Sequence, residues 1–197
     1  MIQMERFESP LFAEAVPEPT KARDLTCNRC AVDHARELIR LWHSRLPKTQ
    51  RGPWMYAFRA AVDDYSYAVA LWNNPSARTL PGHWIELRRM AVAPDAPHCT
   101  ASWFLGAMAK WFMENASQHE VMISYQDEEV HQGTIYKAAG WKVEHRTAAR
   151  IRDRSKPRPN GRIYRLKSHG VSVDAAAKSR WQKNISQNPA KHREQGR

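Results

Sequence analysis

The sequence has few cysteines and no apolar run long enough to cross a bilayer. Its 197 residues include three Cys, an odd and sparse set that argues against a disulfide-stapled scaffold. The first twelve residues lack the hydrophobic segment of a secretory signal peptide. These absences predict a soluble protein of the cytoplasm, without a membrane partner.

Acidic residues are scarce in the last quarter of the chain. Residues 146–197 contain 15 Lys and Arg against Asp153, Asp174 and Glu194, whereas the first 145 residues contain 16 basic and 17 acidic side chains. A near-neutral body with a basic end favours a polyanionic partner, most simply a nucleic acid. The alternative is that this charge only increases solubility.

The apolar content is sufficient for a packed core, since 42% of the residues are hydrophobic and eight are Trp. The length suits one domain with appendages. We expect an extended N-terminal arm over residues 1–30, a main domain over 31–167 and a basic C-terminal tail over 168–197.

Hydrophobic periodicity predicts an alternation of strands and helices. Helices are expected over Ala31–His43, Thr100–Asn115 and Glu129–Ala139, and strands over Trp54–Val62, Tyr65–Trp72, Trp84–Val92, Val121–Tyr125, Trp141–Thr147 and Arg162–Leu166. This order predicts an α/β fold of the α+β type, with a mixed sheet covered by helices. The segment from Ile85 to Tyr125 should form a right-handed parallel crossover.

A strand end at Val92-Ala93-Pro94 leads into a helix, and Tyr136-Lys137-Ala138-Ala139-Gly140-Trp141 closes the predicted domain. This arrangement resembles GNAT-type acyltransferases, in which the loop before that helix holds the pyrophosphate of acyl-CoA. The resemblance implies cofactor binding at Thr100, Ala101 and Ser102. The loop here has no glycine and no Arg or Gln at the usual place, so we expect weak acyl-CoA binding and leave the group donor unknown.

A narrower resemblance rests on several blocks in a shared order. The blocks are Trp42-His43-Ser44-Arg45-Leu46-Pro47, residues 86–97 (ELRRMAVAPDAP), Thr100-Ala101-Ser102, Ile123-Ser124-Tyr125-Gln126-Asp127, residues 131–141 (HQGTIYKAAGW) and Lys178-Ser179-Arg180-Trp181. Together they resemble the Mom proteins of Mu-like bacteriophages. The resemblance spans about residues 31–183.

The resemblance implies modification of double-stranded phage DNA. Mom proteins convert the N6 amino group of adenine to a carbamoylmethylated form, which blocks host restriction enzymes. The family is GNAT-like and iron-dependent, and its motifs carry a possible Fe site over to His43, Asp127 and Tyr136. The oligomeric state is left open.

Each of these three residues also has an ordinary structural alternative. His43 ends a predicted helix, where an imidazole interacts with the helix dipole. Asp127 ends a predicted strand, where catalytic groups gather, but it could cap the next helix. Tyr136 is either a core aromatic or a general acid. Ser124 and Glu86 complete the candidate catalytic set, with Glu86 in an active-site wall or on an ordinary strand face.

Five basic residues and one tryptophan supply the candidate DNA contacts. These are Arg88, Arg162, Lys178, Arg180, Lys183 and Trp181. An aromatic ring in a basic segment can stack on a base, so Trp181 is either a base-stacking residue or an anchor that docks the tail. The Cys27-x-x-Cys30 pair with His34 resembles half of a zinc site, with free thiols as the simpler interpretation.

The leading functional hypothesis is a DNA adenine N6-modifying enzyme. It would have to flip its target base or bind a single strand. The alternatives are a GNAT-type N-acyltransferase for a small amine or protein, and a non-catalytic DNA-binding protein on the same scaffold.

Overall fold

The structure is a computed structural model that describes residues 19–43, 47–49, 54–148, 150–152, 173–175 and 177–186. The elements before the crossover are η1 (Ala22–Asp24), β1 (Thr26–Arg29), α1 (Val32–Trp42), β2 (Tyr56–Val62), β3 (Tyr65–Asn73) and β4 (Trp84–Val92). They are followed by α2 (Thr100–Asn115), β5 (Val121–Asp127), α3 (Thr134–Ala138), β6 (Lys142–Thr147), β7 (Arg150–Arg152), β8 (Val173–Ala175) and β9 (Lys178–Asn184).

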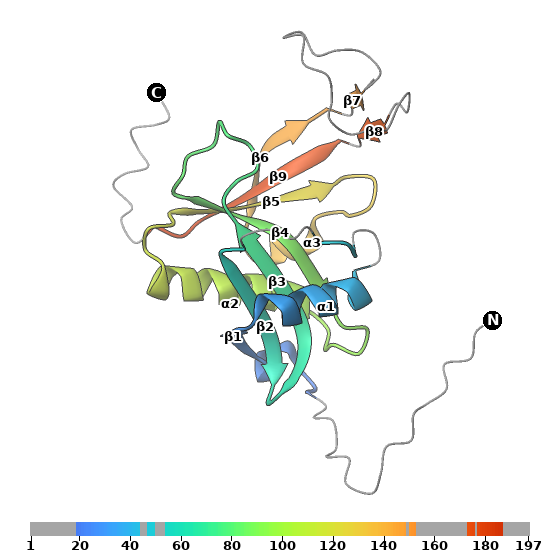
Figure 1. The fold of residues 1–197 in the computed structure, drawn as a ribbon, viewed down its shortest axis with the longest axis vertical. Helices are drawn as coiled ribbons and strands as arrows, with labels where there is room; N and C mark the ends of the chain where they lie inside the picture. The colour runs from blue at the N-terminus through green and yellow to red at the C-terminus, as the bar shows by residue number, and fades with distance from the viewer. Residues whose placement is uncertain are drawn as a thin grey trace, which may run out of the picture.

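Seven strands form one mixed sheet in the order β1-β2-β3-β4-β5-β9-β6 (Figure 1). The expected hairpin is confirmed as β2 and β3, joined at Asp63-Asp64, with Asp63 at a positive φ of 49°. The expected crossover is confirmed too, because β4 pairs parallel to β5 with α2 between them. The α/β fold with a mixed sheet is therefore as predicted.

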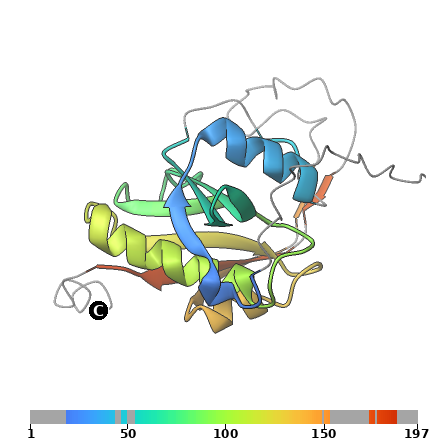
Figure 2. The same cartoon turned by 90° about the horizontal axis from the view of Figure 1, so that it is seen from below.

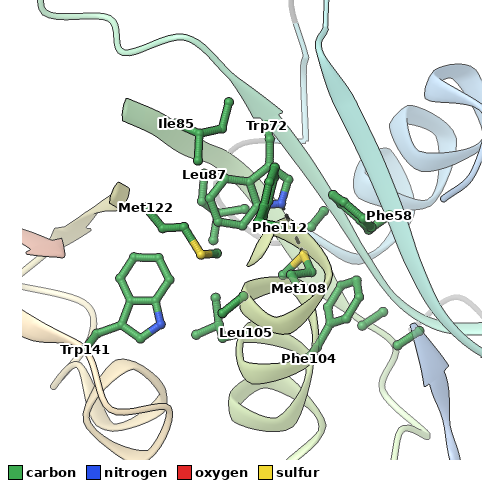
Figure 3. Packing of buried hydrophobic residues seen from close by; sticks show 14 of the residues in the cluster. Phe58, Trp72, Ile85, Leu87, Phe104, Leu105, Met108, Phe112, Met122 and Trp141 are labelled. Atoms are coloured by element: carbon green, nitrogen blue, oxygen red, sulfur yellow. Dashed lines mark hydrogen bonds between the residues drawn. The ribbon is translucent and has the colours of Figure 1, made fainter. Parts of the chain in front are cut away.

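Helices lie on both faces of this sheet, with α1 on one side and α2 on the other (Figure 2). Ile39 of α1 packs on Leu71 and Ala91 in the smaller core. The larger core lies against α2, where the Trp72 Nε1–H donates to Met108 Sδ at 3.1 Å (Figure 3). The aromatic stripe of α2 is thus core packing. None of the helices in the described part of the chain is long and apolar enough to span a membrane.

Two segments predicted as appendages contribute strands to the sheet. β1 lies within the predicted arm and pairs antiparallel with β2 from Thr26 to Arg29. β9 lies within the predicted basic tail, yet it is inserted between β5 and β6. The boundaries placed at residues 30 and 168 are therefore wrong for these strands. Residues 1–18, most of the predicted tail and the strand expected at 162–166 lie outside the described residues.

The last helix is shorter than expected. Periodicity suggested a helix over 129–139, but α3 covers only Thr134–Ala138, after a turn at residues 128–130. Gly133 precedes α3 with a φ of +72°, a left-handed conformation that ends any helix running in from residue 129.

Glu128, which follows β5, binds side chains of both β6 and β9. Its carboxylate accepts bonds from Arg146 of β6 at 2.8 and 2.7 Å and from the hydroxyl of Ser179 in β9. The hydrogen bonds from Arg146 and then Ser179 lower the pKa of Glu128 from 4.5 to about 2. A carboxyl group whose pKa is lowered by folding stabilises the fold at pH values above its ordinary pKa. This contribution is lost as the pH falls through the pKa of the folded state.

We predict that Glu128→Gln flattens the pH dependence of stability between pH 4.5 and about 2, the window set by the two pKa values. Urea unfolding at a series of acidic pH values measures this. Glu114→Gln is the control, because Glu114 makes only a long surface pair with Lys110, at 3.9 Å. An unchanged slope in Glu128→Gln would contradict the prediction.

Candidate active site at the divergence of β4 and β5

The parallel pairing of β4 and β5 stops partway along both strands. It runs from Trp84–Val121 to Leu87–Ser124, although β4 continues to Val92 and β5 to Asp127. Figure 1 shows the two strands separating beyond these pairs. On its other side, β4 carries a β-bulge at Arg88, because Leu71 pairs with Arg89 and Trp72 with Leu87. Most candidate residues lie near this point of the sheet, and Ser124 and Tyr136 are buried there.

Ser124 and Tyr136 form a buried hydroxyl pair at this point. Ser124 is the last residue of β5 paired with β4, and its Oγ lies 2.8 Å from the Tyr136 Oη of α3. Burial raises the pKa of Tyr136, partly offset by the Ser124 hydrogen bond. Tyr136 therefore stays a neutral phenol at neutral pH. Such a pair can donate or relay one proton.

Trp181 of β9 holds Tyr136 in place. Its ring stacks on the Tyr136 ring at 5.3 Å between centroids and 14° between planes. The Trp181 Nε1–H donates to Gln126 Oε1 at 2.5 Å, and the Gln126 amide donates to the His131 carbonyl. Trp181 is only 3% exposed, so the base-stacking hypothesis is contradicted and the anchoring alternative is supported.

Asp127 ends β5 as expected, but it caps no helix. Its Oδ1 accepts the Glu129 N–H at 3.1 Å, and its carbonyl accepts the His131 N–H at 3.1 Å. The N-cap alternative is wrong because α3 begins only at Thr134. Asp127 instead shapes the turn that carries His131.

His43 directly follows α1 and is half-buried. Burial lowers its pKa, and the positive charges of Arg89 and His131 lower it further. His43 is therefore in the electrostatic neighbourhood of β4 and of the β5–α3 turn. The imidazole of His43 is held neutral at neutral pH.

Glu86 and Arg88 anchor the β3–β4 loop. Glu86 accepts the Ser76 N–H at 2.6 Å and its hydroxyl at 3.3 Å. Arg88 Nε lies 3.2 Å from Glu86 Oε1, and Arg88 Nη2 donates to the Asn74 carbonyl at 2.7 Å. These contacts give both residues a structural role, while the catalytic role of Glu86 and the DNA contact of Arg88 stay predictions.

The three residues carried over as iron ligands do not form a ready donor set. The Tyr136 hydroxyl is buried on Ser124 with a raised pKa, which disfavours the phenolate form that binds iron. One Asp127 oxygen is bound within its own turn. Among the described residues, no three His, Cys, Asp or Glu side chains converge as a metal site. The iron site stays a prediction.

A cavity of about 330 Å³ lies between the start of α2 and α3. Its lining includes the three predicted cofactor-binding residues, Thr100, Ala101 and Ser102, and the facing residues Thr134 and Ile135. Backbone N–H groups in the first turn of a helix have no intrahelical acceptor, and the dipole there favours anions. The hydroxyls of Thr100 and Ser102 already donate hydrogen bonds within the loop. Thr100 donates to the Pro97 carbonyl at 2.7 Å, and Ser102 donates to the Cys99 carbonyl at 3.0 Å.

Cys99 lies at the mouth of this cavity in a left-handed conformation, with a φ of 67°. Its Sγ is 3.0 Å from Nδ1 of the neighbouring His98. A non-glycine residue in this conformation is strained, and its Cβ projects beside the backbone that a pyrophosphate would approach. The loop before α2 therefore lies where a phosphate-binding loop would lie, but it lacks the glycines that let a phosphate approach the backbone closely.

The predicted DNA-binding residues are dispersed. Lys178 is exposed at the start of β9, and the Arg180 guanidinium lies over the Trp84 ring at 5.5 Å. Lys183 donates to the Ala139 carbonyl at 2.7 Å, which caps the end of α3. Arg162 lies outside the described residues. The DNA contacts of these residues stay predictions.

The thiols of Cys27 and Cys30 are free. Burial raises their pKa values to about 12 and about 11. Zinc binds thiolates, so such thiols are poor ligands. His34 instead contacts Ser66 Oγ at 3.1 Å. The free-thiol interpretation fits the described residues.

Sequence reasoning missed three polar residues of the site: Arg89, Gln126 and His131. Gln126 and His131 lie inside motifs already recognised, but nothing in the spacing showed that Gln126 would bind the last strand. Arg89 alternates with apolar neighbours in a way that many half-exposed strands share.

The model of the Mom protein family matches residues 24–195. Among solved structures, the ribosomal-protein-S18-alanine N-acetyltransferase of Escherichia coli gives a TM-score of 0.55 at 11% identity, covering 83% of this chain and 96% of that one. The structure of yncA from Salmonella typhimurium, solved with its cofactor acetyl-CoA, gives a TM-score of 0.55 at 8% identity. The match covers 84% of this chain and 96% of that one. A GNAT-family structure from Desulfovibrio desulfuricans gives a TM-score of 0.52 at 12% identity, and the match covers 82% of this chain and 99% of that one. These likenesses establish a GNAT-like fold. No curated protein matches the sequence.

We predict that Gly133→Ala destabilises the fold by about 3 kcal/mol, from left-handed strain and overpacking. A Cβ at Gly133 would overlap the Trp181 ring and lie 2.6 Å from Gln126 Oε1. Gly140→Ala is a matched control at the same φ of +72°, where a Cβ meets only Lys183 Nζ at 3.3 Å. Urea denaturation compares the two variants, and equal losses would contradict the packing argument.

We predict that Cys99→Gly tightens acyl-CoA binding over a weak wild-type affinity, because it relieves the left-handed strain and opens the loop backbone. Its stability should stay within about 1 kcal/mol of wild type. Ala101→Gly is the control, since it removes a side chain from the cavity lining at a helical position and costs up to about 1 kcal/mol. Calorimetry measures the binding, and tight stoichiometric binding by the wild type would overturn the prediction.

Proposed function

The chain belongs to the Mom protein family, and we propose that it is a transferase that modifies the N6 amino group of adenine in double-stranded DNA. The proposed product is the carbamoylmethylated base, which protects phage DNA from host restriction enzymes. The observation that carries the proposal is the family match over residues 24–195 on a sheet that divides beside the Ser124–Tyr136 pair.

The chemistry requires a base and an acid on opposite sides of the transferred group. The exocyclic amine of adenine is a weak nucleophile and must lose a proton when its nitrogen forms the new bond. His43 suits the base, because its lowered pKa leaves the imidazole able to accept that proton at neutral pH. Tyr136 suits the acid that protonates the leaving part of the donor as its bond to the transferred group breaks, because the raised pKa keeps the phenol protonated.

The donor would enter from the cavity at the start of α2. The positive end of a 16-residue helix favours an anionic part of a donor, and Thr134 and Ile135 of α3 form the facing wall. Acetyl-CoA is the cofactor of yncA, which shares the fold. The side chains around Cys99 support a donor other than acyl-CoA, so its identity is left open in the proposal.

The acceptor is an amine stacked inside a duplex, so the base must leave the stack before it reaches Ser124 and Tyr136. A net charge of +11 supports the phosphate contacts that such a complex needs. Among the described residues, Arg88 directly follows the last β4–β5 pair, and Lys178 and Arg180 are candidates on β9, which lies beside β5.

The test is mass spectrometry of nucleosides from plasmid DNA after expression of the full chain. We expect a carbamoylmethylated adenine with the wild type and a 10²- to 10⁴-fold lower yield with Tyr136→Phe, the usual loss when a general acid is removed. Tyr136→Phe keeps the ring that stacks on Trp181. Tyr65→Phe is the control, since it removes a phenol hydroxyl that bonds Asp95 at 3.1 Å.

Each alternative function has its own outcome. Unmodified adenine together with salt-dependent DNA binding would replace the proposal with a non-catalytic DNA-binding protein. Unmodified adenine together with acylation of a small amine or a protein would replace it with a GNAT-type N-acyltransferase. Equal yields from the wild type and Tyr136→Phe would remove Tyr136 from the mechanism but leave the function.

A further inference from the structure

Arg89 is a half-buried cation without a carboxylate partner. Its Nη1 donates to the Arg88 carbonyl at 2.6 Å, while its Nε is buried and has no hydrogen-bond partner in the described structure. None of the ion pairs among the described residues includes it. The Nε of the neighbouring Arg88 is likewise buried without a hydrogen bond, but Arg88 has an ion pair with Glu86 and donates to the Asn74 carbonyl.

Among the described residues, little negative charge lies around Arg89. Ala91, two residues further along β4, packs against α1, so Arg89 lies on the α1 face of the sheet. His43 from the end of α1 and His131 from the β5–α3 turn share this neighbourhood, and Arg88 adjoins it on β4. Of the acidic groups in the described part of the chain, Glu86 is the one that acts on Arg89, and its carboxylate already binds Ser76 and Arg88.

We propose that Arg89 binds an oxyanion of a substrate at the divergence of β4 and β5. The proposal rests on the proposed function for the identity of the substrates. The oxyanion is either a backbone phosphate of the DNA or an anionic group of the small donor. His43 and His131 lie within electrostatic reach of one another, and Arg89 acts on His43 in the same way.

The energetics support a ligand rather than a structural role. A half-buried charge loses part of its hydration, and without a counter-charge this loss is not fully compensated. A guanidinium presents a planar set of N–H donors that matches phosphate and carboxylate oxygens, and the free Nε of Arg89 belongs to that set. The substrate oxyanion would supply the missing charge when it binds.

The first test needs no reaction. Thermal unfolding of the full chain is measured in chloride and in inorganic phosphate at equal ionic strength, for the wild type, Arg89→Gln and the control Arg40→Gln. Arg40 is an exposed residue of α1, so the control makes the same change of charge outside the site. We expect Arg89→Gln to be at least as stable as the wild type in chloride. Phosphate should raise the unfolding temperature of the wild type and of Arg40→Gln more than that of Arg89→Gln.

Two results would overturn the proposal. A large loss of stability of Arg89→Gln in chloride would make the residue structural, and an equal phosphate shift in all three proteins would exclude the site. Since neither result depends on adenine modification, failure of this proposal and failure of the proposed function are observed separately.

A second measurement identifies the source of the oxyanion. If it is a DNA phosphate, Arg89→Gln lowers the log–log salt slope of DNA binding by about one. If it belongs to the donor, the slope is unchanged and the yield of modified adenine falls at least tenfold at saturating DNA. Unchanged slope and unchanged yield would contradict the proposal in either form.

Discussion

The stack of Trp181 on Tyr136 ties the C-terminal strand to the centre of the molecule. It fixes β9 between β5 and β6, and it places the Tyr136 hydroxyl on Ser124. The stack depends in turn on Gly133, because any side chain there would occupy the space of the indole. One aromatic pair therefore sets the order of three strands and the position of the candidate acid.

The division of the sheet explains how residues far apart in sequence share one region. α1 and α2 cover opposite faces, so groups that follow them are normally separated by a layer of strands. The pairing of β4 and β5 ends at Leu87 and Ser124. Arg89 lies just beyond it on the α1 face, while Tyr136, bonded to Ser124, belongs to the core on the α2 face. A two-sided site of this kind can place a base and an acid on opposite sides of one transferred group.

The sequence predicted the parts of the fold with strong local periodicity. The helix Thr100–Asn115 and the hairpin around Asp63-Asp64 have that periodicity, and both are present with bounds close to those expected. β9 was missed because Lys178, Arg180 and Lys183 give it the composition of a solvated tail, although Ser179 and Trp181 alternate with them and are buried. Ser124 and Tyr136 were named from motifs, but their contact depends on a stack with β9 that no local pattern encodes. Arg89 was missed because only the three-dimensional structure shows that, among the described residues, no carboxylate pairs with it.

At the start of α2, the fold and the preceding loop make separate contributions to which donor can bind. The fold places a helix N-terminus and a cavity beside the end of β4, and this position favours an anionic donor group. The loop then restricts which donor fits, since Thr100 and Ser102 bond their own backbone and Cys99 adds a side chain in a left-handed conformation. A pyrophosphate needs several open N–H groups at close approach, whereas a smaller anion needs fewer. The same scaffold can therefore keep the direction of group transfer while the loop changes the carrier of the group.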